Sequence, residues 1–429
     1  MSRPEETPRS LALALSGGGF RATLFHLGSL WRLNELGLLP RLGCISCISG
    51  GSIAGAFLGM NWRSLTFDDR GIALDFPEKI VTPIRRFCSL NVDLVPSLLN
   101  MAAMLVGGCS SALIGSYRTH LFASKTLQDL PDPATGPGII IGGGNLQTGS
   151  RVWFSRERAH DDRLGYIENP AIPLAVVVAI STAYPPFLSP IVLRLDPDSW
   201  RKGPDSDLYH SVNLRSRMVL TDGGIHDPSA IDPLVGEYRT ILVSDGSTTR
   251  EVWRRPSSFW LRQLNRTTLM QTVTASEGRR RALAAHPRDG TVQNPGFPVC
   301  GADFPVCHPA GQAPSRQTRK SAPQASALFQ QPRDETEPSV RTDCSVIWWC
   351  NADKIDDYQV PDALTRDSES TRAFGSMRTR LNSFKPVEQA GLVNWGYALC
   401  DAALRKAAPD LVPSSTSAPH WPFPEHSLS

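Results

Sequence analysis

The sequence has little net charge. Its 429 residues include 44 lysines and arginines against 41 aspartates and glutamates, a formal balance of +3. A protein that binds nucleic acid through the phosphates carries a concentrated basic excess, so we expect no nucleic-acid partner. Hydrophobic residues make up 41% of the chain, as in an ordinary globular protein. The length suits one large domain with insertions, or two domains.

Long hydrophobic runs are also missing. The polar start MSRPEETPRS precedes only a five-residue apolar run, which does not resemble a signal peptide. The most apolar stretch, residues 95–114, contains Asn100, Gly107 and Gly108, which disfavour a membrane span. We expect a buried helix or an interfacial flap there. These absences predict a cytoplasmic protein that contacts a membrane only peripherally.

The nine cysteines lack the close spacing of a disulfide framework. Cys44 and Cys47 form a C-x-x-C pair inside an apolar run, where they are expected to act as small buried hydrophobic residues. Cys300, Cys307 and His308 lie in a Pro-rich stretch without a second close pair. Structural zinc usually takes four ligands, so no metal site is predicted.

The stretch 43–59, GCISCISGGSIAGAFLG, contains the strongest motif. An apolar run ends at Ser49 and is followed by Gly50, Gly51 and a helix of small residues, as in a nucleophile elbow. Ser52 fits a second frame of the same motif, but it would lie in the first helical turn, where a hydroxyl serves as a cap. We therefore predict Ser49 as the nucleophile. A βα turn without chemistry is the alternative.

A second glycine-rich turn, SGGGFR, follows the apolar run at residues 11–15. A strand, a glycine run and a helix place several N–H groups at a helix N-terminus, which suits a phosphate or an oxyanion. No Gly-Lys-Ser/Thr follows, which excludes a Walker loop, and the dinucleotide fingerprint lacks its third glycine. We expect Gly18, Gly19 and Gly50 to hold an oxyanion. Arg21 would add positive charge beside them, or would lie on the surface.

A carboxylate at a strand end completes the motifs. Asp222 follows Val219-Leu220-Thr221 and precedes two glycines, and Asp245 in a Ser-Asp-Gly turn is the second candidate. An ordinary Asp-Gly turn is the alternative for Asp222. His226, four residues later, would make a Ser-His-Asp triad the main mechanistic rival. A histidine on the same loop as its aspartate is unusual in such triads, so we favour Asp222 as the direct base.

The composition divides the chain into a globular core and several segments of different character. Pro, Gln and Ser accumulate in the insertion, and the arginines at 279–281 suit a solvated helix face or anionic lipid. We expect an unstructured N-terminus (1–10), a core (11–253), a basic helical segment (254–284), a disordered low-complexity insertion (285–340), the C-terminal part of the same domain (341–406) and a disordered tail (407–429).

Three separated motifs, SGGGFR, ISGGS and the DGG at Asp222, together resemble the patatin-like phospholipases. NLQTGSRVWFSR and AISTAYPPFLSP are similar to the region before the aspartate in bacterial members, and LVNWGYALCDAALR is similar to their last helix. The resemblance covers residues 10–250 and, more weakly, 345–406. Two positions depart from the family pattern: Cys47 replaces the first elbow glycine, and Gly142-Gly143-Gly144 precede NLQTG.

The resemblance implies a three-layer α/β/α fold with a mostly parallel central sheet. It also implies a Ser–Asp dyad without histidine, metal or organic cofactor. By their match to the family motifs, the implied residues are the nucleophile Ser49, the base Asp222, the oxyanion loop Gly17, Gly18 and Gly19 with Gly50, and the anion- or substrate-binding Arg21.

The predicted function is a serine lipid acyl hydrolase that cleaves fatty acyl esters of phospholipids or other membrane lipids through an acyl-enzyme. Its expected partners are the acyl-lipid substrate and, transiently, a membrane surface. A soluble carboxylesterase or thioesterase would use the same chemistry. A catalytically idle lipid-binding scaffold and a nucleotide-binding protein are the alternatives from other classes.

Overall fold

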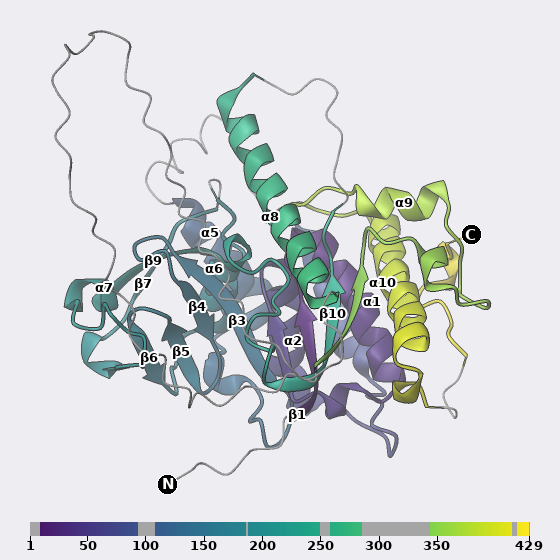
Figure 1. Ribbon diagram of the computed structural model, residues 1–429, viewed down its shortest axis with the longest axis horizontal. Coiled ribbons are helices and arrows are strands. Elements are labelled where there is room, and N and C mark those ends of the chain that lie inside the picture. The colour runs from purple at the N-terminus through teal and green to yellow at the C-terminus, as the bar shows by residue number, and fades with distance from the viewer. Residues whose placement is uncertain are drawn as a thin grey trace, which may run out of the picture.

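The computed structural model describes residues 9–92, 108–185, 188–248, 258–284, 344–413 and 418–428. The insertion expected at 285–340, the Cys300, Cys307 and His308 group, and residues 95–107 of the apolar stretch lie outside the described residues. The described strands form one 11-stranded sheet with helices on its faces (Figure 1). The α/β/α fold expected from the sequence is confirmed.

Five neighbouring strands of this sheet are parallel, in the order β11-β10-β1-β2-β3. They are β1 (Arg9–Leu15), β2 (Cys44–Cys47), β3 (Gly138–Asn145), β10 (Tyr238–Asp245) and β11 (Ser345–Cys350). Because parallel strands are covered on both faces, they consist of nearly continuous apolar residues. The carboxyl ends of these strands share one edge of the sheet, where ligand sites of α/β folds usually lie.

The remaining strands are antiparallel and extend the sheet beyond β3. They are β4 (Arg151–Phe154), β5 (Arg158–Asp161), β6 (Gly165–Glu168), β7 (Ile191–Arg194), β8 (Trp200–Arg201) and β9 (Arg217–Asp222). β4 pairs along one edge of β3. β2 and then β9 pair along the other edge.

Alternating side chains of β1 separate the two cores of the domain. Leu11, Leu13 and Leu15 join the larger core, together with residues of α1, α2, α6 and α10. Ala12 and Ala14 join the smaller core, which Leu283 of α8 helps to cover. The described helices are α1 (Gly19–Glu35), α2 (Gly50–Asn61), α3 (Thr82–Cys88), α5 (Gly108–Tyr117), α6 (Leu174–Ser181), α7 (Val212–Ser216), α8 (Trp260–Ala284), α9 (Glu369–Gly375) and α10 (Pro386–Ala407).

The C-terminal segment belongs to this sheet and its helical layer. β11 pairs with β10, and α10 packs along α1 (Figure 1). Among the described residues, no helix combines the length and the apolar character needed to cross a membrane.

The C-terminal tail differs from the expectation of disorder at 407–429. Residues 418–428 lie against the helices, where the Asn394 amide donates hydrogen bonds to the carbonyls of Phe423 and His426. The Phe423 ring packs edge-on against Trp31 and under the Arg85 guanidinium. Proline and serine dominate the composition of the tail, but its few aromatic residues supply enough buried contact to hold it in place.

Candidate active site

Ser49 lies at the sharp turn between β2 and α2. Its backbone angles, φ 52° and ψ −122°, are strained for a residue with a side chain. The Ser49 N–H donates a hydrogen bond of 2.9 Å to the Ser181 hydroxyl at the end of α6. The side chain is 9% exposed. A serine held in a strained turn at the carboxyl edge of a parallel sheet has the geometry of a nucleophile elbow.

The glycines after Ser49 allow two loops to pack backbone against backbone. A Cβ on Gly50 would lie 2.2 Å from the Gly19 carbonyl oxygen, and one on Gly51 would lie 2.3 Å from the Leu15 carbonyl oxygen. No side chain fits in these spaces, so both positions require glycine. The elbow and the SGGGFR loop therefore form one compact unit.

Strand register brings Asp222 to the elbow. β2 pairs with β3 up to Cys47 opposite Ile141, and β9 pairs with the next part of the same edge, with Asp222 opposite Gly143. β9 is antiparallel to β3, so it runs toward the end of β2. The two strands meet end to end, and their terminal side chains come together.

The Asp222 carboxyl lies close enough to the Ser49 side chain for that hydroxyl to lower its pKa, and it accepts a hydrogen bond of 2.7 Å from the Gly224 N–H. It is 3% exposed. Burial raises the pKa of Asp222 to about 7, although the Gly224 N–H and the Ser49 side chain both favour the charged form. A carboxyl group with this pKa is matched to accept and return a proton near neutral pH.

The glycine loop supplies N–H groups close to the elbow. Gly18 and Gly19 have φ values of 138° and 62°, which residues with side chains rarely adopt. The N–H groups of Gly18, Gly19 and Gly50 donate no hydrogen bond to another described residue. Gly17 differs from the expectation, since its N–H donates to the Pro228 carbonyl at 3.0 Å. Its missing side chain instead leaves room for Ser49, whose Cβ would lie 3.3 Å from a Cβ on Gly17.

Arg21 lies beneath the glycine loop with only 1% of its surface exposed. Its guanidinium donates to the Gly246 carbonyl at 2.7 Å, to the Met377 carbonyl at 2.8 Å and to the Thr379 hydroxyl. These acceptors engage the guanidinium within the protein. The arrangement therefore differs from the expected direct contact with an anion and suits a residue that orders the loop.

The rival serine and carboxylate have other partners. Ser52 lies in the first turn of α2, as expected, and its hydroxyl donates to the Ser49 carbonyl at 2.6 Å instead of capping the helix by accepting a backbone N–H. Asp245 accepts hydrogen bonds from Ser247, Ser276 and Trp348. These contacts occupy Asp245 on the far side of β1 from the elbow.

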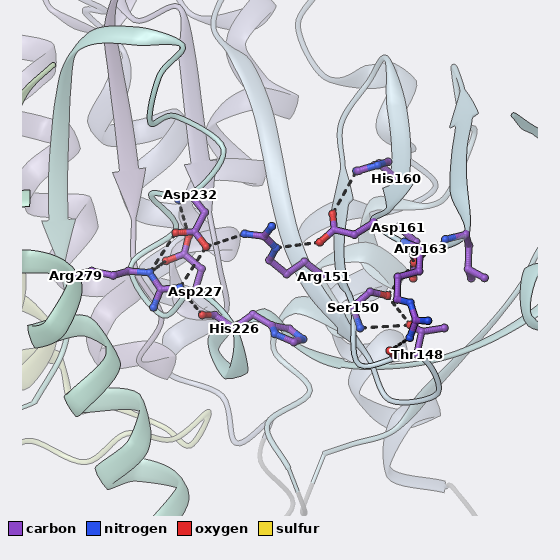
Figure 2. A network of polar contacts seen from close by, with 12 residues as sticks. Thr148, Ser150, Arg151, His160, Asp161, Arg163, His226, Asp227, Asp232 and Arg279 are labelled. Carbon is purple, nitrogen blue, oxygen red and sulfur yellow. Dashed lines mark hydrogen bonds and ion pairs between the residues drawn. The ribbon is translucent and has the colours of Figure 1, made fainter. Parts of the chain in front are cut away.

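The two histidines nearest to the motifs do not complete a triad in the described residues. His26 bridges the Ser244 hydroxyl and the Ser16 carbonyl, and burial lowers its pKa to about 4. The pKa of His226 is lowered by burial and by the nearby positive charge of Arg151, and its Nε2 has no hydrogen-bond partner among the described residues. Figure 2 shows its ring beside a network of charged side chains.

That network holds the loop after Asp222 and was not anticipated from the sequence. Arg279 of α8 pairs with Asp232 at 3.1 Å and with buried Asp227 at 3.6 Å, and it donates to the His226 carbonyl (Figure 2). Arg151 pairs with Asp232 at 3.0 Å. The arginines expected on a solvated or lipid-binding face therefore include at least one that binds carboxylates of its own domain. Charge runs look alike in sequence whether their partners are water or distant carboxylates.

A family model described as patatin-like phospholipase matches residues 13–235. No curated protein matches the chain. The chain is similar to the solved structure of human GIVD cytosolic phospholipase A2, with 14% identity and a TM-score of 0.47, covering 94% of this chain and 60% of that one. It is also similar to VipD from Legionella pneumophila, with 13% identity and a TM-score of 0.35, covering 95% of this chain and 68% of that one.

The chain thus spans about 60% of the length of the phospholipase A2 structure. The region matched by the family model contains both motif loops, the elbow and Asp222, and amounts to more than half of the 429 residues. The chain belongs to the patatin-like phospholipase family.

Proposed function

We propose that the chain is a serine lipid acyl hydrolase in which Ser49 and Asp222 form a catalytic dyad. The observation that carries this proposal is the proximity of the Ser49 side chain to a buried carboxyl whose pKa is about 7. A serine hydroxyl is a weak nucleophile until a base accepts its proton. Asp222 meets both requirements for that base, contact and pKa.

In the first half of the reaction, the Ser49 oxygen attacks the carbonyl carbon of the acyl ester while its proton passes to Asp222. The carbonyl oxygen becomes an oxyanion, for which the N–H groups of Gly18, Gly19 and Gly50 are the available donors. When the tetrahedral intermediate collapses, the alcohol leaves with the proton from Asp222. The acyl group remains esterified to Ser49.

In the second half, water attacks the acyl-Ser49 ester and Asp222 accepts a proton from it. Collapse of the second tetrahedral intermediate returns the proton to the Ser49 oxygen and releases the fatty acid. Ser181 supports both halves by accepting the Ser49 N–H, which holds the elbow in its strained conformation. Arg21 acts as a positioning residue that connects the glycine loop to Gly246 and to residues 377–379.

The test is fatty-acid release from mixed phospholipid vesicles by the wild type and by three variants. We expect Ser49→Ala to be inactive and Asp222→Asn to lose at least about 100-fold, the usual contribution of a general base. Ser52→Ala is the matched control and should retain most of the activity. Full activity in Asp222→Asn would exclude the dyad.

A fluorophosphonate probe separates an incompetent site from a wrong substrate. It forms a bond from its phosphorus to an activated serine oxygen and releases fluoride. Labelling of Ser49 without vesicle hydrolysis would favour a soluble ester or thioester as the substrate. Absence of both labelling and hydrolysis would favour an idle scaffold.

A further inference from the structure

The N-terminal half of α8 extends beyond the body of the protein (Figure 1). It carries large apolar side chains in water: Phe259 is 54% exposed, Trp260 67%, Leu264 43% and Met270 53%. Trp260 and Leu264 are four residues apart and so lie on one face of the helix. At 3.6 residues per turn, this face is opposite the side on which buried Val273 and Ser276 pack against the domain.

The C-terminal half of α8 is held firmly to the edge of the sheet that carries Ser49. Ser276 donates to Asp245 at 3.1 Å and contacts Ser229 at 3.2 Å. Asp245 ends β10, and β10 is parallel to β1, which is parallel to β2, so Asp245 and the elbow share one edge. Arg279 anchors the same half of the helix to the loop after Asp222.

Trp260 precedes Ser276 by sixteen residues, which corresponds to about 24 Å along a helix. The exposed apolar side chains are therefore displaced from the carboxyl edge of the sheet by a rigid helical arm. Because the arm is fixed beside Asp222, a surface that binds its tip has a defined position relative to Ser49.

The charge pattern identifies the kind of surface. Residues 258–276 contain no aspartate or glutamate and two arginines, at positions 262 and 266. Tryptophan prefers the boundary between hydrocarbon and headgroups. Arginines beside exposed apolar residues are typical of helices that bind anionic membrane surfaces.

We propose that the N-terminal half of α8 docks on an anionic phospholipid surface, with Trp260 and Leu264 entering the headgroup region. This inference rests on the proposed function. A membrane docked on α8 would supply the lipid substrate of the Ser49 site. Docking through α8 combines apolar contact with positive charge, so both should contribute to binding.

The apolar contribution is tested by flotation with vesicles of phosphatidylcholine containing phosphatidylglycerol. Trp260→Ser/Leu264→Ser should weaken binding about tenfold or more, given the transfer energy of two large side chains. Leu74→Ser/Val387→Ser is the matched control, because these side chains are 64% and 62% exposed elsewhere. The control should bind within about twofold of the wild type. Equal binding by the Trp260/Leu264 variant would overturn the proposal.

The charge contribution is tested on the same helix. Arg262→Gln should weaken binding to anionic vesicles about fivefold, as expected for one arginine near an anionic surface. It should have no effect on vesicles of phosphatidylcholine alone. Arg281→Gln, at the other end of α8, removes an exposed arginine paired with Glu277 and should leave binding unchanged. Equal losses in both variants would contradict docking through the N-terminal half.

Binding is measured in a Ser49→Ala background, so that hydrolysis does not alter the vesicles. Vesicle binding without any lipid hydrolysis by the wild type would refute the proposed function and leave the docking surface standing. Hydrolysis with unaltered binding by Trp260→Ser/Leu264→Ser would refute the docking surface alone. A concentration-dependent dimer that this double variant abolishes, without vesicle binding, would identify a second copy as the occupant and overturn the proposal.

Discussion

Two residues with unfavourable local energetics meet at the site. Ser49 has a positive φ of 52°, which costs on the order of 1–3 kcal/mol for a residue with a side chain. Asp222 is buried in surroundings that raise its pKa to about 7. Each feature destabilises the folded state, and each suits a nucleophile paired with a neutral-pH base. Functional sites commonly combine such costs.

The pKa of Asp222 predicts how activity depends on pH. Below pH 7 the carboxyl is protonated and cannot accept the Ser49 proton, whereas above pH 7 it is ionised. On a soluble, non-ionising ester, kcat/KM should therefore rise with pH and reach half its maximum near pH 7. A half-maximum near pH 4 would indicate an unperturbed carboxylate as the base.

Asp222→Asn should stabilise the protein while inactivating it. The folded-state pKa of about 7 lies above the unfolded value of 3.8, so the folded state loses stability as pH rises from about 4 to 7. Asparagine removes this loss and can still accept the Gly224 N–H. We expect a gain on the order of a few kcal/mol at pH 8 and almost none at pH 4, measured by urea denaturation. Exposed Asp69→Asn is the control, and a gain that did not vary with pH would contradict this explanation.

At the scale of elements, α1 and α10 pack with their backbones in contact. A Cβ on Gly28 would lie 1.9 Å from the Val393 carbonyl oxygen, and one on Gly396 would lie 1.9 Å from the Phe25 carbonyl oxygen. The crossing also buries an ion pair of 2.7 Å between Arg32 and Asp401. Since α1 begins at the glycine loop, this packing determines where the loop N–H groups lie.

Gly28→Ala should therefore be strongly destabilising. The obstructing atom is backbone, so the helices must separate, and we expect a loss of about 3 kcal/mol, the upper part of the usual range for overpacking. Gly278→Ala is the matched helical control, because no described atom outside its own stretch of helix lies within 4 Å of its Cβ position. It should stabilise α8 by about 0.5–1 kcal/mol. Chemical denaturation measures both values, and similar effects would show that α1 and α10 have room to adjust.

At the scale of the whole molecule, α8 connects the smaller core to the loop that carries Asp222. Asp227 and Asp232 on that loop share Arg279. Burial and the neighbouring charge of Asp232 raise the pKa of Asp227, and Arg279 opposes this shift. The helical arm and the loop after Asp222 therefore depend on one set of ion pairs.

Arg279→Met should destabilise the protein by about 3 kcal/mol, because it leaves buried Asp227 without its cation. The loss should be larger at pH 8.5 than at pH 5.5. Without Arg279 the pKa of Asp227 rises further, so ionisation opposes folding more strongly as pH increases. Thermal unfolding at both pH values measures this, with exposed Arg281→Met as the control. A loss independent of pH would assign Arg279 a packing role alone.

The sequence by itself determined the local features of this protein. Gly50 and Gly51 after an apolar run, and the glycines before Arg21, indicate tight turns because short-range sterics require glycine there. The buried character of residues 11–15 and the first-turn position of Ser52 follow from equally local patterns. Such features depend on neighbours within a few residues, which are visible in the chain.

Only the tertiary structure decided which distant groups meet. The approach of Asp222 to Ser49 depends on the register of β9 and β2 along β3, and the partners of Arg21 and Arg279 come from segments far away in sequence. The extension of α8 beyond the sheet likewise depends on where its C-terminal half packs. Pairing and packing between remote segments are collective properties of the folded chain, and single residue patterns do not specify them.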